Sequence, residues 1–324
     1  MKILITDKVH PSLISRLKND GHEVDYRTDI TLSEVISILP SYNGIVINSK
    51  IKMDSKAIDR NPNLDFIARL GSGMEIVDIH YAHSKNIRII NTPEGNCNAV
   101  GEQALGMLLM LSNNLYRGNE EVKSYQWNRE KNRGIEIRGK TVGIIGVGHT
   151  GSSFAKKLQG WDVTLLGYDK YKKGYEKEFP YIEESTLEHI QDQADIISFH
   201  LPLTPETIYF CDNIFLNRCQ KRPIIINTSR GVVIKTPDLI QALLSGRIIG
   251  ACLDVLENEK PKTYTSQEKE MYQQLFSFDQ VITSPHVAGW TFESLKKIAD
   301  LVYERINNGY SIEIPKYANS FFEK

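Results

Sequence analysis

The stretch from Lys140 to Asp169 limits the fold of this chain more than any other part of the sequence. An apolar run, Thr141 to Ile145, is typical of a buried parallel strand. It leads directly into Gly146, Gly148 and Gly151, which have the spacing G-x-G-x-x-G. A strand that ends in this glycine pattern predicts a tight turn into the start of a helix.

A helix and a second strand are predicted behind the glycines. Phe154, Ala155 and Leu158 recur with helical spacing, and Gly160 is a typical stop signal. The apolar run from Val163 to Gly167 then predicts another strand. Taken alone, the glycine pattern has a simpler explanation as a turn without a ligand, but the flanking elements together favour a βαβ unit that binds a dinucleotide.

Each glycine has its own steric role in binding a diphosphate. Gly146 permits the tight turn, Gly148 lets the main chain approach the diphosphate, and Gly151 lets helix and strand pack closely. The amides at the start of the helix then bind the anion. Asp169 lies 18 residues after Gly151, where a carboxylate can bind the ribose hydroxyls and repel a 2′-phosphate. The sequence predicts NAD, and Lys170 beside this carboxylate leaves NADP as a weaker alternative.

Length and composition set the broad class of the protein. The chain has 324 residues, and a prior of roughly 150 residues per domain suggests two domains. A formal net charge of −1 gives no reason to expect nucleic acid or an anionic membrane as a partner. The start of the chain, MKILITD, lacks a signal-peptide pattern, and no apolar run approaches ~20 residues. We therefore expect a cytoplasmic enzyme or binding protein.

Neither the cysteines nor a histidine pair predicts a metal site. No two cysteines have the C-x-x-C spacing, so free thiols in a reducing compartment are expected at Cys97, Cys211, Cys219 and Cys252. His80 and His83 share one face of a helical pattern, but no acidic or thiol partner lies nearby in sequence. A surface helix explains this pair better than a metal.

The first 90 residues alternate short apolar runs with helical patterns, as parallel α/β domains do. The predicted strands are Ile3 to Ile5, Glu23 to Tyr26, Ile45 to Ile47, Phe66 to Ala68 and Arg88 to Ile90. Helices are predicted from His10 to Lys18, after a capping box at Thr31 and Glu34, and after Asp54. This pattern predicts a small α/β domain without a dinucleotide motif.

A glycine turn, Arg69 to Met74, follows the fourth of these strands. Gly71 and Gly73 could serve only to form a tight turn. Alternatively, the amides of Ser72 and Gly73 could bind a substrate carboxylate at the carboxyl end of the strand.

The middle of the chain reads as a connection between domains. Asn91 to Pro93 resembles a linker, and the segment from Asn98 to Ser112 predicts a long buried helix. The following polar segment, Glu120 to Arg138, contains Trp127, which would be easier to explain at an interface. Homodimerisation is therefore a hypothesis.

Four further strands are predicted after the dinucleotide unit. They span Asp195 to Phe199, Ile224 to Asn227, Ile248 to Leu253 and Val281 to Thr283. Polar residues follow them, and the carboxyl ends of parallel strands face one ligand crevice. These residues are His200, Asn227 to Gly231, Asp254 and Ser284 to His286. A closing helix from Thr291 to Asn307 is expected to cross back to the first domain.

Several ordered motifs together resemble the D-isomer-specific 2-hydroxyacid dehydrogenases. They are RLGSGMEIVD, GVGHTGSSFA, HLPLT, INTSRG, CLDVLENE and SPHVAG, and they cover essentially the whole chain. The resemblance implies a Rossmann-type, doubly wound NAD domain at 93–291 and a smaller flavodoxin-like substrate domain at 1–92 plus 292–324. It also implies a short form without a C-terminal regulatory domain.

The family resemblance implies three catalytic residues. His286 would exchange a proton with the C2 oxygen of the substrate, which suits imidazole chemistry. Glu259 would orient the ring and favour its protonated form. Arg230 would hold the α-carboxylate and carbonyl with its planar set of donors. Each residue alone has an ordinary structural explanation, and their joint occurrence at strand ends favours catalysis.

The same resemblance implies the ligand contacts. Asp254 would meet the nicotinamide carboxamide. The implied cofactor contacts are Gly146, Gly148, His149, Thr150, Gly151, Asp169, His200, Pro202, Thr207, Thr228, Ser229, Asp254, His286, Ala288 and Gly289. The implied substrate contacts are Asn48, Lys50, Ser72, Gly73 and Arg230.

Two departures from the family pattern affect the expected substrate. The segment KPKTYTSQEKE is expected to lengthen a loop between Glu259 and His286. Asn48-Ser49-Lys50 stands where phosphoglycerate enzymes commonly show arginine and serine, so recognition of a substrate phosphate is in question. Lys50 and Lys52 could bind an anionic group, but a pair of solvated lysines is the simpler explanation. D-3-phosphoglycerate, and with it serine biosynthesis, is the first expectation. Hydroxypyruvate or glyoxylate and D-lactate are the alternatives, and an NAD-binding sensor or corepressor-like protein is the candidate from another class.

Overall fold

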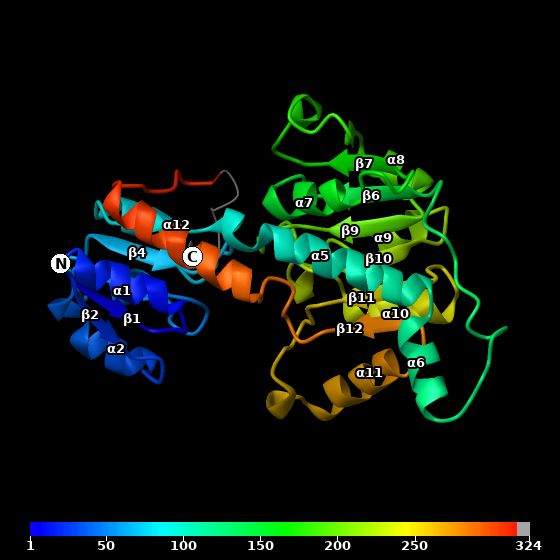
Figure 1. Ribbon diagram of the computed structural model, residues 1–324, viewed down its shortest axis with the longest axis horizontal. Coiled ribbons are helices and arrows are strands. Elements are labelled where there is room, and N and C mark those ends of the chain that lie inside the picture. The colour runs from blue at the N-terminus through cyan, green and yellow to red at the C-terminus, as the bar shows by residue number, and fades with distance from the viewer. Residues whose placement is uncertain (316–324) are drawn as a thin grey trace. The chain divides into compact units, whose positions relative to one another are not determined.

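The chain forms two compact α/β units in a computed structural model, which describes residues 1–315 (Figure 1). Unit 1 contains Met1–Cys97 and the chain from Trp290 onward, and unit 2 contains Asn98–Gly289. The chain passes between the units at 97/98 and 289/290, compared with the expected 92/93 and 291/292. The predicted α/β fold class is confirmed in each unit.

Unit 1 contains a five-stranded parallel sheet in the order β2-β1-β3-β4-β5. This order is the flavodoxin-like arrangement of a doubly wound sheet. Its strands are β1 (Lys2–Ile5), β2 (Glu23–Tyr26), β3 (Gly44–Ile47), β4 (Phe66–Arg69) and β5 (Arg88–Ile90). Each predicted strand of this domain is confirmed to within one residue at either end.

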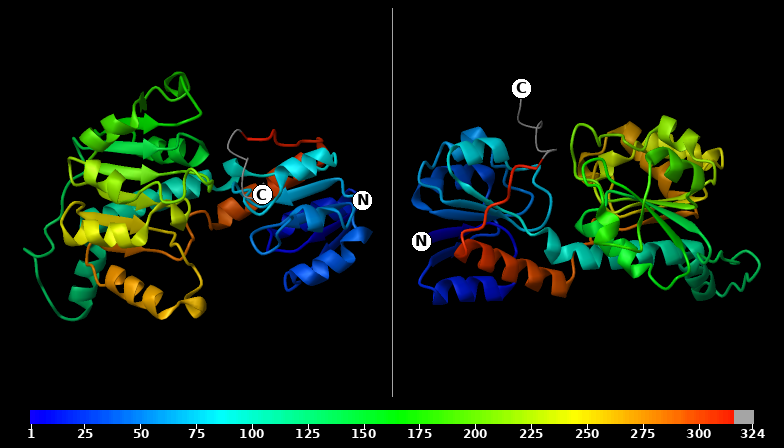
Figure 2. Two further views of the ribbon diagram at one scale, coloured as in Figure 1. Left: turned by 180° about the vertical axis from the view of Figure 1, so that it is seen from behind. Right: turned by 90° about the horizontal axis from the view of Figure 1, so that it is seen from above.

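Helices cover both faces of this sheet (Figures 1 and 2). Because side chains alternate along a strand, Ile3 and Ile5 of β1 point to one face and Leu4 to the other. The first face packs against α1 (Pro11–Asn19) and α12 (Phe292–Asn307). The second packs against α2 (Leu32–Ile38), α3 (Ser55–Ile58) and α4 (Ile79–Ser84), and η1 (Leu39–Ser41) extends α2.

Local signals place the helix starts of unit 1 correctly. The Thr31 hydroxyl accepts from the Glu34 amide and the Glu34 carboxylate accepts from the Thr31 amide, which completes the predicted capping box. The Asp54 carboxylate accepts from the Ala57 amide at 3.0 Å, as expected for an N-cap.

Unit 2 contains a seven-stranded parallel sheet in the order β12-β11-β10-β9-β6-β7-β8. Numbered within the unit, this is the Rossmann order 3-2-1-4-5-6 with one further strand at the edge. The strands are β6 (Thr141–Ile145), β7 (Thr164–Tyr168), β8 (Glu183–Glu184), β9 (Ile196–Phe199), β10 (Ile224–Asn227), β11 (Gly250–Leu253) and β12 (Val281–Thr283).

Two hydrophobic layers cover the faces of this sheet. One contains α5 (Pro93–Ser112) and α7 (His149–Lys157), and the other contains α8 (Leu187–Gln193), α9 (Asn213–Arg218), α10 (Thr236–Leu244) and α11 (Ser266–Phe276). Short 3-10 turns η2 (Tyr175–Lys177), η3 (Gly231–Val233) and η4 (Pro261–Thr263) join these elements. The sheet is buried on both faces, so every parallel strand can end at one polar edge.

Three sequence expectations are corrected by the structure. The expected linker Asn91 to Pro93 is shorter, because Pro93 is already the first residue of α5, a position where its missing N–H costs nothing. The polar segment that starts at Glu120 begins inside a further helix, α6 (Leu115–Lys123). The segment KPKTYTSQEKE does not extend a loop throughout, because Thr265 caps α11 within it and Glu268 completes a capping box.

The cysteine and histidine expectations have different outcomes. All four cysteines are free, and burial raises the pKa of the thiols of Cys211, Cys219 and Cys252. His80 and His83 lie on α4 but are half-buried rather than on an open surface, and their Nε2 atoms have no hydrogen-bond partner among residues 1–315. Across the same described residues, no helix combines the length and apolar character needed to cross a membrane.

Candidate active site

The glycine turn between β6 and α7 separates three steric roles. Gly146 has a φ of +94°, and a Cβ there would lie 2.4 Å from the carbonyl oxygen of His200. A Cβ on Gly151 would lie 2.0 Å from the carbonyl oxygen of Gly146, so only glycine lets α7 pack on this turn. Gly148, the N-cap of α7, has no atom within 4 Å of an added Cβ. Its missing side chain therefore keeps open space in front of the helix.

This open space is what a dinucleotide diphosphate requires. Gly148 is exposed, and His149 and Thr150 form the first turn of α7 beside it. Helix amides and the helix dipole attract an anion at such a position. The three glycines thus have the steric arrangement of a dinucleotide turn, and the spacing alone did not establish it.

Asp169 follows β7, the strand next to β6, and its carboxylate forms a hydrogen bond with the glycine turn. Its Oδ2 atom accepts from the Val147 amide at 3.0 Å, and its Oδ1 atom accepts from the amides of Tyr171 and Lys172 at 2.9 Å. These bonds fix the carboxylate beside the turn. Two carboxylate oxygens have about four acceptor positions, so three amide bonds leave capacity for a ribose hydroxyl.

His200 lies where the strand order of unit 2 reverses, between β6 and β9. Its Nε2 atom is 2.9 Å from the Ser198 hydroxyl, whereas Nδ1 has no hydrogen-bond partner among residues 1–315. Burial lowers the pKa of His200 to about 3, so its ring is neutral at physiological pH. Ligands bind at such reversal points in open parallel sheets.

The loop after His200 is held by its own side chains. The Thr207 hydroxyl donates to the carbonyl oxygen of Pro202 at 2.7 Å and accepts from the Thr204 amide at 2.8 Å. Pro202 and Thr207 were expected as cofactor contacts from the family resemblance. In the structure they also shape this loop.

The end of β10 presents Arg230 through a tight polar turn. The Asn227 Oδ1 atom accepts from the Ser229 amide and hydroxyl at 3.0 and 2.8 Å, and its Nδ2 atom donates to the Arg230 carbonyl at 2.9 Å. Thr228 is buried in this turn, and its hydroxyl has no hydrogen-bond partner among residues 1–315. A Cβ on Gly231 would lie 1.9 Å from the Leu256 carbonyl oxygen, so glycine is required there.

Asp254 supports the loop that carries His286. This carboxylate is 1% exposed, and its oxygens accept from the Ser284 hydroxyl at 2.6 Å and from the amides of Val287 and Ala288 at 3.0 and 2.9 Å. Its backbone carbonyl also accepts from the His286 amide. Asp254 therefore has a structural role in addition to the nicotinamide contact that the resemblance implies.

His286 is held in an unusual backbone conformation. Its φ is +55°, in the left-handed region that costs a non-glycine residue about 1–2 kcal/mol. The bonds from Asp254 on both sides of it offset this cost. Such strain at a strand end, next to polar side chains, is typical of functional sites.

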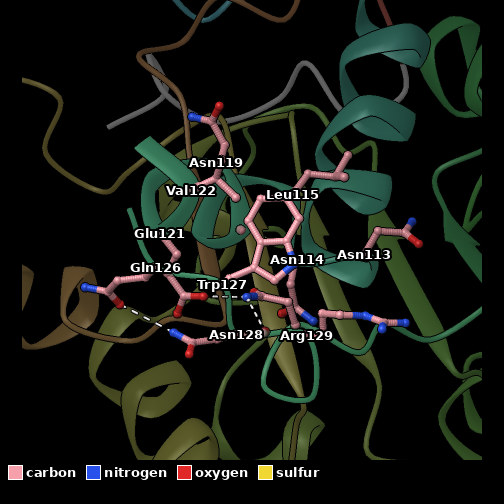
Figure 3. A pocket seen from close by; sticks show the side chains of 12 residues that line it. Asn113, Asn114, Leu115, Asn119, Glu121, Val122, Gln126, Trp127, Asn128 and Arg129 are labelled. Carbon is pink, nitrogen blue, oxygen red and sulfur yellow. Dashed lines mark hydrogen bonds between the residues drawn. The ribbon is translucent and has the colours of Figure 1, made fainter. Parts of the chain in front are cut away.

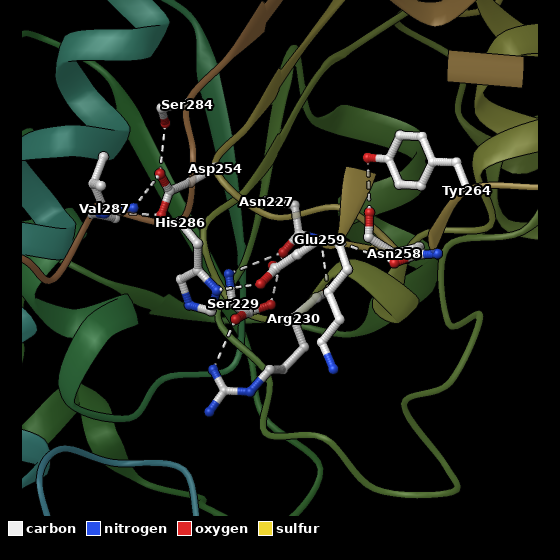
Figure 4. A network of polar contacts seen from close by, with 12 residues as sticks. Asn227, Ser229, Arg230, Asp254, Asn258, Glu259, Tyr264, Ser284, His286 and Val287 are labelled. Atoms are coloured by element: carbon white, nitrogen blue, oxygen red, sulfur yellow. Dashed lines mark hydrogen bonds and ion pairs between the residues drawn. The ribbon is translucent and has the colours of Figure 1, made fainter. Parts of the chain in front are cut away.

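Glu259 and His286 meet although 27 residues separate them. Their Oε2 and Nδ1 atoms are 2.8 Å apart (Figure 4). Figure 4 shows Arg230 in the same network, with its guanidinium donating to the Ser229 carbonyl at 2.8 Å. All three predicted catalytic residues thus lie in unit 2, at the carboxyl ends of adjacent parallel strands or in the loops that follow them.

The other predicted substrate contacts lie in unit 1. Asn48 and Lys50 follow β3, and Ser72 and Gly73 follow β4, so the four residues share one edge of the sheet. The Asn48 amide donates to Asp7 at 3.0 Å, and the Lys50 ammonium donates to the Thr28 carbonyl at 2.5 Å. Their proposed contact with a substrate held by unit 2 stays a prediction.

Sequence reasoning placed Asn227 and Ser284 at the ligand edge without a role and missed Ser198 and Gln103. Asn227, Ser284 and Ser198 each bond a predicted site residue, and the Gln103 side chain of α5 donates to the Ser284 hydroxyl at 3.1 Å. Ser198 lies within β9, two residues before His200, and could have been found from that position. Gln103 carries no local signal, because its partner lies 181 residues away.

Comparison with known proteins assigns the chain to a family. A family model described as "D-isomer specific 2-hydroxyacid dehydrogenase, NAD binding domain" matches residues 105–288, which is more than half of the chain. The chain belongs to the D-isomer specific 2-hydroxyacid dehydrogenase family. Residues 105–288 of this family member fall within unit 2, so unit 2 is its NAD-binding domain.

Two similar proteins are named for different substrates. D-3-phosphoglycerate dehydrogenase of Archaeoglobus fulgidus is 30% identical over 95% of this chain and 57% of its own length. Hydroxypyruvate reductase of Thermotoga maritima is 30% identical over 84% of this chain and 86% of its own length. This member of the D-isomer specific 2-hydroxyacid dehydrogenase family thus spans little more than half of the archaeal relative.

A solved structure shows the same fold. D-lactate dehydrogenase from Aquifex aeolicus, complexed with NAD and lactic acid, matches with a TM-score of 0.83 and 24% identity over 95% of each chain. The residues described above fit a nicotinamide cofactor of this family: Gly148 leaves open space at the start of α7, and the carboxylate of Asp169 lies beside that turn.

Proposed function

We propose that this protein is an NAD-dependent dehydrogenase that interconverts a D-2-hydroxy acid and its 2-keto acid. The contact between Glu259 and His286, in the unit that carries the dinucleotide turn and Arg230, carries the proposal. A carboxylate, an imidazole and a guanidinium supply the acid–base group and the anion binder that the reaction needs.

Each of these residues has a role that its contacts support. A nicotinamide cofactor held by the glycine turn and Asp169 would supply the hydride chemistry at substrate C2. His286 uses Nδ1 for Glu259, so its Nε2 atom gives a proton to the C2 oxygen during reduction and takes it back during oxidation. Glu259 fixes the orientation of this ring through its contact with Nδ1. Arg230 binds the substrate carboxylate with its planar set of donors.

D-3-phosphoglycerate is the first candidate substrate. The archaeal relative named for that activity is similar over 95% of this chain. Hydroxypyruvate or glyoxylate comes next, because the Thermotoga relative is named hydroxypyruvate reductase, and D-lactate is a further alternative. Lys50 points its ammonium at the Thr28 carbonyl, so phosphate binding by this residue requires that bond to be exchanged. A role in serine biosynthesis follows only if the first candidate is correct.

The surroundings of Asp169 support NAD rather than NADP. Its fixed carboxylate opposes a 2′-phosphate. Glu206 contacts both following side chains, Lys170 at 2.7 Å and Tyr171 at 2.5 Å. The bond to Lys170, and then the bond to Tyr171, lowers the pKa of Glu206, so this carboxylate remains charged and neutralises the nearest cation.

A sensor or corepressor-like protein with the same fold is the alternative from another class. Such a protein would bind NAD and use the bound state to control assembly. The strained, doubly supported His286 next to Glu259 favours the enzyme, because a sensor needs no proton donor.

A substrate panel tests the proposal. Oxidation of NADH and NADPH is followed with 2-keto acids that include phosphohydroxypyruvate, hydroxypyruvate, glyoxylate and pyruvate. We expect turnover with NADH on one of them and a loss of at least 100-fold in kcat for His286→Ala and Arg230→Ala. His189→Ala, a change at an exposed histidine of the same unit, is the matched control. Flat traces across the panel would favour the sensor, and near wild-type rates in both variants would reject the catalytic roles.

The proposed assembly is a homodimer. Five large hydrophobic side chains between residues 115 and 127 are exposed, Tyr125 fully and Trp127 by 78%. Trp127 lies with Leu115 and Val122 in a hollow of about 700 Å³ (Figure 3). We propose that a second copy covers this segment. A cytoplasmic location stays a prediction from the sequence.

A further inference from the structure

The segment that departs from the family pattern, KPKTYTSQEKE, surrounds Asn258 with hydrogen bonds. Asn258 directly precedes Glu259, the partner of His286. Figure 4 shows Asn258 between Tyr264 and Glu259. The bonds to Asn258 come from residues 260, 263 and 264 and from two residues of α11, Glu268 and Tyr272.

Two tyrosine hydroxyls hold the main chain of Asn258. The Tyr272 hydroxyl accepts from its amide at 2.9 Å, and the Tyr264 hydroxyl donates to its carbonyl at 3.0 Å. The two rings are in contact, with centroids 4.8 Å apart and planes tilted by 30°. Tyr272 is 2% exposed, so one of these anchors belongs to the packed core of unit 2.

Both polar atoms of the Asn258 side chain also form hydrogen bonds. Its Nδ2 atom donates to Glu268 at 2.9 Å, and its Oδ1 atom accepts from the Lys260 amide at 3.0 Å. Glu268 is the third residue of α11 and completes its capping box, because its other oxygen accepts from the Thr265 amide at 2.7 Å. One carboxylate therefore caps α11 and anchors the residue next to Glu259.

The contact between Glu259 and His286 needs such an anchor. The two side chains are 42% and 46% exposed. An exposed ion pair contributes little when both side chains must be ordered to form it. If the main chain before Glu259 is already fixed, less freedom is lost when the contact forms.

We propose that Asn258 is a positioning residue, through which the segment 260–272 holds Glu259 in contact with His286. This inference rests on the proposed dehydrogenase function. It assigns a role to the part of the chain that departs from the family pattern, and it predicts that Asn258 acts only through Glu259.

A double-mutant cycle tests this dependence. Asn258→Ala, Glu259→Gln and the double variant are compared with the wild type in steady-state reduction of the active keto acid. We expect Asn258→Ala to lower kcat about tenfold at an unchanged KM for NADH, since a small misplacement of a group in the site can cost up to about 100-fold. In the Glu259→Gln background the same change should have less than a twofold effect, because the contact that it supports is already lost.

The split between kcat and KM separates positioning from a general loss of structure. A general loss of structure would raise the KM for NADH and lower kcat in both backgrounds, whereas loss of positioning lowers kcat only where Glu259 is present. Tyr264→Phe, which removes one anchor from a half-buried ring, should show the same loss of kcat to a smaller extent. If Asn258→Ala does not fold, Tyr264→Phe replaces it in the cycle.

The outcomes distinguish this inference from the proposed function. Asn217→Ala, whose side chain bonds only Asn213 among the contacts described, is the matched control and should leave all values unchanged. Equal effects of Asn258→Ala in both backgrounds, or none in either, would overturn the positioning role. A wild-type rate for Glu259→Gln would instead overturn the proposed catalytic role of Glu259.

Discussion

Single polar residues in the candidate site bind the neighbouring backbone and side chains. Asp254 binds Ser284, Val287 and Ala288, and Asn227 binds Ser229 and Arg230. Buried polar groups require partners, so each is placed by its own bonds before any ligand arrives. As a result, the geometry of the candidate site is set by contacts within the free protein.

His200 makes stability depend on pH in a defined direction. Its pKa in the folded protein is about 3, whereas the ordinary value is 6.5. Between these values the unfolded chain binds a proton that the folded chain does not, so stability is complete above pH 6.5 and falls as the pH decreases toward 3. At pH 5 this term amounts to about 2 kcal/mol, from 1.36 kcal/mol per pH unit.

The variant His200→Gln should lack this term. We expect the free energy of unfolding in urea to fall between pH 7.5 and 5.0 by about 2 kcal/mol less in His200→Gln than in the wild type. His189→Gln, at an exposed histidine, should follow the wild type. Parallel losses in His200→Gln and the wild type would show that His200 is protonated in the folded protein.

At the scale of elements, two glycines of the β6–α7 turn are expected to have different roles, Gly151 in stability and Gly148 in ligand binding. A methyl group on Gly151 meets the carbonyl oxygen of Gly146, whereas a methyl group on Gly148 meets nothing within 4 Å. Gly151→Ala should destabilise the free protein by about 1–3 kcal/mol or more, as overpacking does. Gly148→Ala should leave the free protein within about 0.5 kcal/mol of the wild type.

Gly148→Ala is expected to affect nucleotide binding although it hardly affects stability. We expect Gly148→Ala to weaken NADH binding at least tenfold, because its methyl group occupies the space that the diphosphate needs. Urea unfolding without ligand and fluorescence titration with NADH measure the two effects separately. Gly139→Ala is unsuitable as a control because its φ is +71°, so Gly106→Ala, with open space in α5, is used. Unchanged NADH affinity in Gly148→Ala would place the diphosphate elsewhere.

At the scale of the whole molecule, the exposed segment 115–127 predicts association. The wild type should sediment at micromolar concentration with twice the chain mass of 36.9 kDa. Replacing Tyr125 and Trp127 together by alanine should shift the mass toward the monomer, because these are the most exposed aromatic side chains of the segment. Trp161→Ala, at a half-exposed tryptophan outside the segment, should remain a dimer. A wild-type mass of 36.9 kDa would reject the homodimer.

Local sequence patterns predicted most of the fold and the chemical groups of the site. Alternating strand and helix patterns predicted both parallel sheets, and the glycine spacing predicted the dinucleotide turn, because each depends on residues close together in the chain. Since parallel strands end at one edge, their order also predicted that Arg230 and His286 lie in one unit.

The tertiary structure alone decided how these groups are held. The bonds of Asp254 across some 30 residues and the anchoring of Asn258 by α11 join distant segments. The start of α5 at Pro93 and the helical part of KPKTYTSQEKE were mistaken for loops although local signals mark both, a proline at the first helical position and the capping box of Thr265 and Glu268. The long-range contacts, in contrast, depend on loop geometry and packing in three dimensions, which residue type and spacing do not encode.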